Sequence, residues 1–272
     1  MPRRMRLFTA ALAVLTCLTV GSPADATAAP AKKKGVSAWN FTDVTKALAD
    51  SRAGWFYTWA PDRQQIKPPA GVEFVPMIWG AGSVTDAQLR TARQEGTTLL
   101  GFNEPDLPAQ ANMSVTRALD LWPRLQSTGM RLGAPAVAGG GDAAGGWLDQ
   151  FMKGAAARHD KVDFIPLHWY GSDFRADAAT GQLRGYLQAV YNRYKKPIWL
   201  TEYALIDFSS GTPKYPTPEQ QAAFVTKSTA MLQGLPFVER YAWFTLSADR
   251  GGTGLYNRAT PNRVGTAYRA AG

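Results

Sequence analysis

The sequence predicts an α/β protein, a compact (β/α)8 barrel in which eight parallel strands alternate with helices. Eight short apolar runs follow one another along the 272-residue chain, and most contain β-branched or aromatic residues. Most of these runs are continuous rather than alternating, as expected for strands that are buried on both faces. Eight strand–helix units in a chain of this length favour a closed barrel, which takes about 250 residues, over an open sheet.

The expected elements follow from these runs and from the helix signals between them. The strands are expected at residues 36–40, 54–59, 74–79, 98–103, 131–137, 162–170, 198–204 and 240–246. Helices are expected at residues 85–95, 114–128, 145–158, 176–194, 218–233 and 260–270. Thr85 and Thr217 are candidate N-caps, and Pro218 suits a first helical position. Segment 60–71 is rich in proline and polar residues, so the second helix is expected to be short or missing.

Two glycine patterns bear on ligand classes. No G-x-G-x-x-G follows the first apolar run, which counts against dinucleotide binding. Segment 139–146 is rich in glycine but lacks the lysine and the Ser/Thr of a phosphate-binding loop. It is expected to be a flexible loop after the fifth strand.

Residues 1–28 are typical of a secretory signal peptide. Three arginines precede an apolar stretch at 7–20 that is short for a bilayer span. Ala26–Thr27–Ala28 is a candidate cleavage site, and Ala24–Asp25–Ala26 is a second. An uncleaved anchor and lipidation at Cys17 are the alternatives, and Thr16 before the cysteine disfavours the latter. The sequence thus predicts a secreted protein with a basic flexible tail at 29–35 and a single barrel domain at 36–272.

Composition narrows the function classes further. The formal net charge is +9, but no basic stripe with interleaved aromatics indicates nucleic acid. The chain has two histidines, and its one cysteine lies in the leader, so no metal and no cofactor are expected. No later stretch is apolar enough to cross a membrane. We therefore expect no membrane attachment after signal cleavage. We also expect a monomer.

Two glutamates stand out as candidate catalytic groups. The active site of such a barrel lies at the carboxyl ends of its strands. Glu104 ends the fourth expected strand and Glu202 ends the seventh, whereas the other glutamates fall on helices or at strand starts, at positions 73, 95, 219 and 239. Two carboxylates at one barrel mouth suit glycoside cleavage, in which one protonates the leaving oxygen and the other attacks the anomeric carbon. The alternative is a pair of structural carboxylates held by arginines or backbone amides.

Four motifs carry a resemblance to a known family. They are Gly101–Phe102–Asn103–Glu104–Pro105–Asp106, Leu167–His168–Trp169–Tyr170, Trp199–Leu200–Thr201–Glu202–Tyr203 and Tyr241–Ala242–Trp243–Phe244. In this order the chain resembles glycoside hydrolase family 128, the Asl1-like group of clan A, over nearly all of residues 36–272. The family's members are retaining β-1,3-glucanases on a compact barrel.

The resemblance implies roles for the matched residues. Glu104 would be the acid/base and Glu202 the nucleophile. Asn103 would hydrogen-bond the sugar 2-hydroxyl, with a strand-end cap as the alternative. Tyr170 would donate to Glu202, unless it serves packing. His168 would bond a carboxylate or a sugar hydroxyl, unless it is a core histidine.

Aromatic residues near the strand ends are candidate sugar platforms, because an aromatic face packs on the apolar face of a pyranose. The candidates are Trp59, Trp79, Trp169, Trp243 and Tyr203. Each could instead belong to the core. Asp106 could either hold its loop or touch a distal sugar.

The expected function is therefore secreted, endo-acting hydrolysis of β-1,3-glucan by double displacement. One alternative is a hydrolase of another β-glucan or of a β-mannan, because related pockets share the same carboxylates. The alternative from another class is a catalytically silent β-glucan-binding protein, because a fold does not fix a function.

Overall fold

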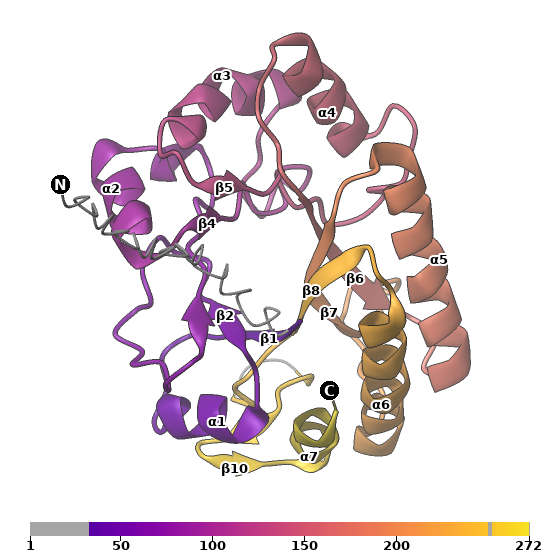
Figure 1. Cartoon of the computed structure of the whole chain (residues 1–272). Coiled ribbons are helices and arrows are strands. Elements are labelled where there is room, and N and C mark those ends of the chain that lie inside the picture. Colours follow the sequence, from indigo (N-terminus) through magenta and orange to yellow (C-terminus); the bar gives the residue numbers. More distant parts are fainter. Residues whose placement is uncertain (1–32, 250–251, 272) are drawn as a thin grey trace, which may run out of the picture. The chain divides into compact units, whose positions relative to one another are not determined.

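Parallel strands form a ring in chain order, with helices outside it (Figure 1). The computed structural model describes residues 33–249 and 252–271. The barrel strands are β1 (Lys34–Ser37), β2 (Trp55–Tyr57), β3 (Glu73–Phe74), β4 (Thr98–Leu99), β5 (Arg131–Leu132), β6 (Ile165–Gly171), β7 (Ile198–Leu205) and β8 (Val238–Trp243). Six of them pair in the order β3-β2-β1-β8-β7-β6, and β4 pairs with β5. The isolated bridges Met77–Leu100 and Gly133–Phe164 connect this pair to β3 and β6 and close the ring. The predicted (β/α)8 barrel is confirmed.

Most of the strands are shorter than the sequence predicts, and three of them are much shorter. Strands β3, β4 and β5 have two residues each, although longer runs were expected there. Pro76 and Pro135 interrupt two of these runs, and proline cannot donate a ladder hydrogen bond. The chain beyond them keeps the barrel direction through single bridges, such as Asn103–Ala136.

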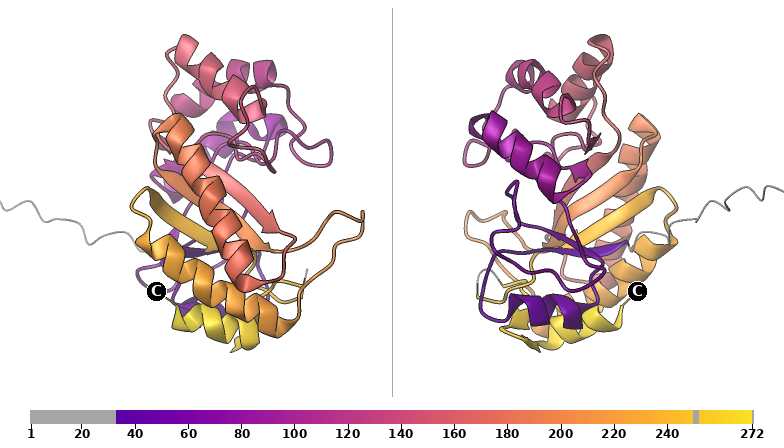
Figure 2. Two further views of the ribbon diagram at one scale, coloured as in Figure 1. Left: turned by 90° about the vertical axis from the view of Figure 1, so that its right-hand side faces the viewer. Right: turned by 60° about the vertical axis from the view of Figure 1, so that its left-hand side comes forward.

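The helices cover the outer face of the ring (Figure 2). They are α1 (Val44–Ser51), α2 (Asp86–Glu95), α3 (Val115–Gln126), α4 (Trp147–Ala157), α5 (Ala176–Tyr194), α6 (Pro218–Gly234) and α7 (Arg263–Ala270). Thr85 caps α2, and Thr217 forms a capping box with Gln220 at α6, as predicted. Segment 60–71 contains no helix, which confirms the missing second helix.

An α-helix and a β-hairpin were not predicted. Helix α1 has eight residues and follows Asp43, a residue type that marks helix starts, although the Asp43 side chain makes no cap hydrogen bond. Helix α7 begins later than expected, because Thr260–Pro261 forms β10 and pairs with β9 (Tyr256–Asn257) in an antiparallel hairpin. Asn262 then caps α7 by accepting from Gly265 N.

The predicted signal peptide, residues 1–28, lies outside the described residues, as does most of the predicted basic tail. The tail prediction is wrong at its end, because Lys34 and Gly35 belong to β1. Lys33 Nζ donates to Leu235 O at 2.9 Å, at the end of α6. The buried Lys34 Nζ donates to Tyr268 O at 3.0 Å, in the last turn of α7. Each ammonium therefore satisfies carbonyls at a helix C-terminus, where the helix dipole also favours a positive charge.

The barrel interior is filled by its own apolar cluster. This cluster consists of Trp55, Tyr57, Val75, Met77, Leu100, Phe164, Trp199 and Ala242. Arg240 stacks over Trp199 at 4.3 Å and pairs with Glu73, and Arg131 pairs with Glu239. Glu73 and Glu239 thus hold arginines at the strand starts, the end of the barrel opposite to Glu104 and Glu202.

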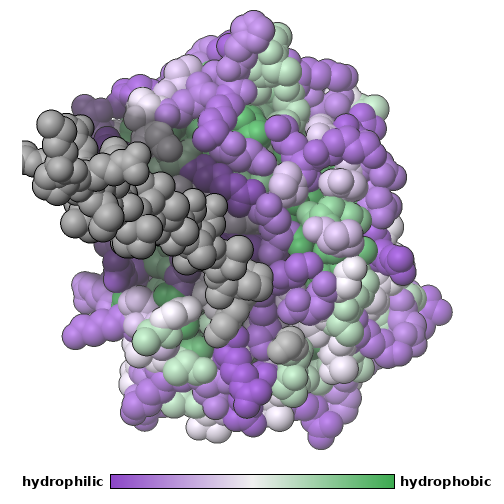
Figure 3. Space-filling model, in the orientation of Figure 1, coloured by the Kyte–Doolittle hydropathy of each residue, from purple (hydrophilic) through white to green (hydrophobic). Residues whose placement is uncertain are grey.

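The surface drawn in Figure 3 is mostly hydrophilic, with apolar areas scattered among polar residues. Within residues 33–249 and 252–271, no helix combines the length and apolarity that crossing a bilayer requires.

Candidate active site

Glu104 lies five residues beyond β4, at the end of the segment that continues the strand direction through single bridges. Asn103 bridges Ala136, and the Glu104 N–H donates to Ala136 O at 2.7 Å, which fixes the backbone at this point. Glu104 adopts a left-handed conformation with φ of 43° and is 8% exposed. This conformation is strained for a residue with a Cβ, and such strain concentrates at functional sites.

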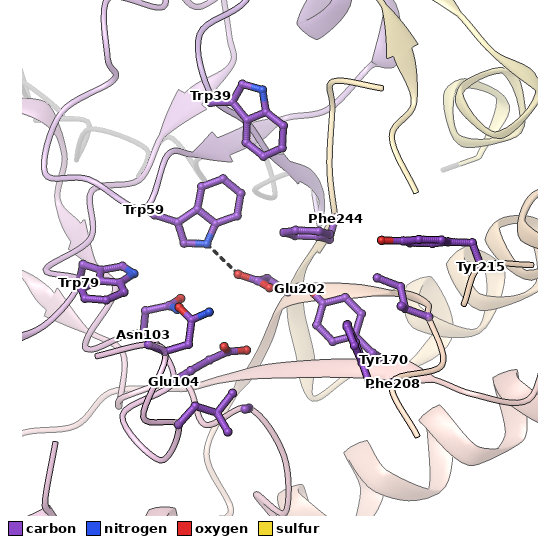
Figure 4. Close-up of a pocket in the computed structure, with 14 residues that line it drawn as sticks. Trp39, Trp59, Trp79, Asn103, Glu104, Tyr170, Glu202, Phe208, Tyr215 and Phe244 are labelled. Atoms are coloured by element: carbon purple, nitrogen blue, oxygen red, sulfur yellow. Dashed lines mark hydrogen bonds between the residues drawn. The ribbon is translucent and has the colours of Figure 1, made fainter. Parts of the chain in front are cut away.

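Glu202 lies in β7 and is surrounded by hydrogen-bond donors. Its Oε1 accepts from Trp59 Nε1 at 2.7 Å (Figure 4) and from the Tyr57 hydroxyl at 3.1 Å. Its Oε2 accepts from the Tyr170 hydroxyl at 2.5 Å. A carboxyl facing three donors serves as an acceptor, which is the role of the ionised form.

The pairing of β6 with β7 places His168 beside Glu202. Leu167 pairs with Leu200, but His168 pairs with Glu202, so the register shifts at this point. A bulge of this kind re-aims side chains and is common next to active sites. The shift brings the β6 histidine and the β7 glutamate to the same level of the barrel.

His168 connects the two glutamates. Its Nδ1 lies 2.7 Å from Glu104 Oε1, and its Nε2 lies 3.6 Å from Glu202 Oε1. Burial lowers the pKa of His168, but the charges of Glu202 and Glu104 and the bond to Glu104 outweigh it, so that the pKa is raised.

The two carboxylates are close enough for a shared reaction. One oxygen of Glu104, one oxygen of Glu202 and a ring nitrogen of His168 lie within 4.8 Å of one another. These three side chains are the described group that could hold a metal ion. Each already has hydrogen-bond partners in the protein, and the spacing is that of paired carboxylates acting on one bond.

A cleft of about 870 Å³ opens in front of the glutamates. Glu104, Glu202 and Asn103 lie on its floor together with Tyr170, and aromatic rings line much of its wall (Figure 4). The three large hydrophobic residues exposed in the described part of the chain, Leu107, Phe208 and Tyr215, all line this cleft. Exposed apolar surface gathered in one place indicates a binding site.

Of the five aromatics predicted as sugar platforms, two line the cleft. They are Trp59 and Trp79. Trp59 has a second role that was not predicted, because its indole N–H bonds Glu202.

The other three do not reach the cleft, so their prediction was wrong. Tyr203 and Trp243 are 0% exposed and contact each other, with ring centroids 5.0 Å apart. Trp169 packs on Phe224 of α6. Successive side chains of a strand point to opposite faces. Since Glu202 faces the cleft, Tyr203 faces the helices, and the same alternation turns Trp169 outward between His168 and Tyr170.

Several cleft residues were missed by reasoning from the sequence. They are Trp39, Leu107, Gln110, Ala138, Ile206, Phe208, Tyr215 and Phe244. Tyr57, which is buried beneath the cleft and donates to Glu202, was missed as well. The same alternation could have found Phe244, which follows the outward-facing Trp243. Nothing in the sequence distinguishes Phe208 and Tyr215, because they lie in the irregular segment between β7 and α6.

Asn103 and Asp106 complete the β4 end of the site. The Asn103 amide donates to Gln110 Oε1 at 3.4 Å, and its buried Oδ1 has no hydrogen-bond partner among the described residues. Asp106 Oδ1 accepts from Ala138 N at 3.0 Å. Asp106 therefore ties the loop after β4 to the loop after β5. The structure thus supports a role in holding the loop rather than in touching a distal sugar.

The glycine-rich segment 139–146 is held more firmly than the flexible loop that was expected. Gly141 N donates to the Tyr186 hydroxyl at 3.2 Å, and Gly145 N donates to Asp149 at 2.8 Å. Arg193 Nε donates to Asp142 O at 2.9 Å. The segment is thus fastened to α4 and α5.

The tyrosines that face Glu202 are held in their neutral form. Burial, followed by the negative charge of Glu202, raises the pKa of Tyr57 well above its ordinary value. The same causes raise the pKa of Tyr170 well above its ordinary value. Both hydroxyls therefore remain donors over the pH range in which proteins usually work.

Comparison with known proteins gives a consistent result. A family model described as glycosyl hydrolase catalytic core matches residues 35–268. Alkali-sensitive linkage protein 1 of Schizosaccharomyces pombe is 31% identical over 204 residues, 72% of this chain and 35% of that protein. The chain thus spans about a third of the length of this relative.

Solved structures extend the comparison. An endo-β-1,3-glucanase of glycoside hydrolase family 128, subgroup I, from Amycolatopsis mediterranei, in complex with laminaripentaose, is 70% identical with a TM-score of 0.87. The match covers 88% of this chain and 99% of that chain. A subgroup II endo-β-1,3-glucanase from Sorangium cellulosum is 30% identical with a TM-score of 0.74, over 89% and 99% of the two chains.

Proposed function

The chain belongs to the glycosyl hydrolase catalytic core family and, within it, to glycoside hydrolase family 128, and we propose that it is a retaining endo-β-1,3-glucanase. The observation that carries the proposal is the pair of carboxylates, Glu104 and Glu202, with oxygens within 4.8 Å of each other in an aromatic-lined cleft. Retaining glycosidases hold their carboxyl groups about 5–5.5 Å apart, and inverting enzymes about 6.5–9.5 Å. Oxygens this close are nearer to the retaining spacing than to the inverting one, which supports retention.

In the first step, Glu104 acts as the acid. It gives its proton to the glycosidic oxygen while a Glu202 oxygen attacks the anomeric carbon from the opposite face of the sugar. The bond to the leaving sugar breaks, and a covalent glycosyl–Glu202 intermediate forms. In the second step, Glu104 takes a proton from water, the water oxygen attacks the anomeric carbon, and Glu202 leaves as a carboxylate. Two inversions restore the β configuration.

The donors around Glu202 prepare it for both steps. Trp59, Tyr57 and Tyr170 fix the orientation of the carboxylate before attack and stabilise the charge that returns when the intermediate breaks down. Groups arranged in advance around a charge cost no reorganisation during the reaction.

Asn103 supports the sugar in the reacting position. Its buried Oδ1 has no protein partner among residues 33–249 and 252–271, while its amide nitrogen is oriented by Gln110. An acceptor in this state suits a sugar 2-hydroxyl, whose hydrogen bond strengthens in the transition state.

The proposal also includes where the enzyme works and how it cleaves its substrate. Residues 1–28 act as a signal peptide, so the enzyme is secreted, and it acts on extracellular β-glucan as a monomer. The basic, apolar and small-residue order of the leader supports export. Endo action is supported by the 70% identical relative, which is an endo-β-1,3-glucanase.

The proposal is tested by incubating the protein without its leader with laminarin, curdlan, a mixed-linkage β-glucan and a β-mannan. We expect reducing ends to appear from the β-1,3-glucans, with oligosaccharides of several lengths early in the reaction. Glu202→Ala serves as the matched inactive control. Cleavage confined to another polysaccharide would assign a different substrate, and binding to curdlan without hydrolysis would identify a silent binding protein.

A further inference from the structure

His168 is a buried titratable residue beside both glutamates, and neither step of the proposed reaction uses it. Its side chain is 0% exposed, so it cannot touch the sugar. Its Nδ1 lies 2.7 Å from Glu104 Oε1. Its Nε2 has no hydrogen-bond partner among the described residues, and Glu202 Oε1, at 3.6 Å, is too distant to be one.

This geometry decides where the imidazole carries its hydrogen. A neutral histidine donates from one ring nitrogen, and the neighbouring groups select the tautomer. A hydrogen on Nε2 alone would bury an N–H without an acceptor, which is costly. A hydrogen on Nδ1 points at Glu104 Oε1. In the imidazolium form both nitrogens carry a hydrogen, so Nδ1–H donates to Glu104 in either state.

We propose that His168 is a positioning residue that determines which oxygen of Glu104 carries the catalytic proton. The inference rests on the proposed function and deepens it. Because Oε1 is occupied as an acceptor of Nδ1–H, the acid proton resides on Oε2. Figure 4 shows the Glu104 carboxylate turned into the cleft in front of Glu202.

The proposal adds no proton carrier to the reaction. In the first step, the proton on Oε2 passes to the glycosidic oxygen as the bond between that oxygen and the anomeric carbon breaks. In the second step, Oε2 receives a proton from the attacking water. His168 keeps its own Nδ1 hydrogen throughout, and it stabilises the Glu104 carboxylate that exists between the two steps.

Two substrates separate this role from a structural one. Laminaripentaose has a sugar leaving group that must be protonated. A 2,4-dinitrophenyl β-laminaribioside has a leaving group that departs without acid assistance. For each enzyme, the ratio of kcat/KM on the two substrates cancels the fraction of the preparation that is folded. The ratio therefore reports acid catalysis in the first step alone.

Three variants separate the two ring nitrogens. His168→Asn presents an amide N–H near the position of Nδ1, and His168→Gln presents one near Nε2. His168→Leu presents neither. Acid–base groups contribute about 100-fold or more to such steps. We expect the Leu and Gln variants to lose about 100-fold in kcat/KM on laminaripentaose but less than about 3-fold on the aryl glycoside. The Asn variant should recover at least about tenfold on laminaripentaose relative to Leu.

Other outcomes overturn the proposal. Equal losses on both substrates would show that His168 only supports the fold. A Gln variant as active as the Asn variant would place the important hydrogen bond at Nε2. If the wild type itself fails to cleave laminaripentaose, the proposed function fails and takes this inference with it. If the wild type is active and the variants' substrate ratios do not change, only the role of His168 is contradicted.

Discussion

Single side chains in this cleft serve more than one purpose, and Trp59 is the clearest case. Its ring lines the cleft and stacks near Trp39, with centroids 5.9 Å apart, while its N–H holds Glu202. A sugar platform therefore also orients the nucleophile. Strand-end tryptophans can be found in the sequence, but the hydrogen bond depends on an indole orientation that only the packed structure fixes.

Trp59→Phe should lower kcat on laminaripentaose by about 10–100-fold. It removes a hydrogen bond to a charged group, which contributes about 1.5–3 kcal/mol, and keeps an aromatic ring in the cleft. Trp79→Phe is the matched control, because Trp79 lines the cleft without a bond to either glutamate. Steady-state kinetics of both variants check this expectation. Equal losses of kcat would contradict the separate role of the Trp59 N–H.

Tyr170→Phe should lower kcat by the same factor at every pH between about 6 and 9.5. Burial and the charge of Glu202 raise the pKa of Tyr170 well above its ordinary value, which disfavours the phenolate. The hydroxyl therefore donates across this range. The wild-type to variant ratio of kcat, measured as a function of pH, tests this. A ratio that falls towards 1 as the pH rises would mean that the tyrosine loses its proton within the range.

At the scale of elements, the sequence predicted which segments form strands and helices better than it predicted which side chains face the cleft. Long apolar runs and caps such as Thr217 are local signals. The register shift that pairs His168 with Glu202 depends on packing between β6 and β7 and leaves no local signature. Strand alternation was available from the sequence, and applying it would have excluded Tyr203 and Trp243 and selected Phe244.

Lys34, the first residue of β1, also fastens helix α7 to the barrel. Lys34→Met should lower the free energy of unfolding by about 1–3 kcal/mol, because it leaves buried carbonyls at the end of α7 without their donor. Lys46→Met is the control, since Lys46 is mostly exposed and forms a surface ion pair with Asp43. Urea unfolding measures both changes. If the Lys34 variant is as stable as the Lys46 variant, the Lys34 hydrogen bond to the end of α7 does not stabilise the fold.

Across the whole molecule, two groups of charged side chains lie at opposite ends of the barrel. Arginine–glutamate pairs stack on aromatic rings at the strand starts, and the glutamate–histidine–glutamate group lies at the strand ends. The closed order of eight runs could be predicted from the sequence. The two charged groups could not be predicted from the sequence, because their residues lie far apart in the chain and meet only when the ring closes.

His168 should make the stability of the molecule depend on pH. Its pKa is raised in the folded state, so its protonated form contributes stability that is complete below the ordinary value of about 6.5. That contribution is lost as the pH rises through the raised value. Unfolding measured from pH 5.5 to 8.5 should show a larger fall for the wild type than for His168→Asn. Parallel profiles would contradict the charged state of His168.

The central claim is that Glu202 is the nucleophile and Glu104 the acid/base of a retaining reaction, and azide rescue tests it most directly. On 2,4-dinitrophenyl β-laminaribioside, Glu202→Ala should lose nearly all turnover. Azide should restore it and yield the α-glycosyl azide, because azide then attacks the anomeric carbon directly. Glu104→Ala should form the β-glycosyl azide through the covalent intermediate. The reverse pattern of anomers, or a Glu202→Ala enzyme with wild-type rates, would contradict the assignment.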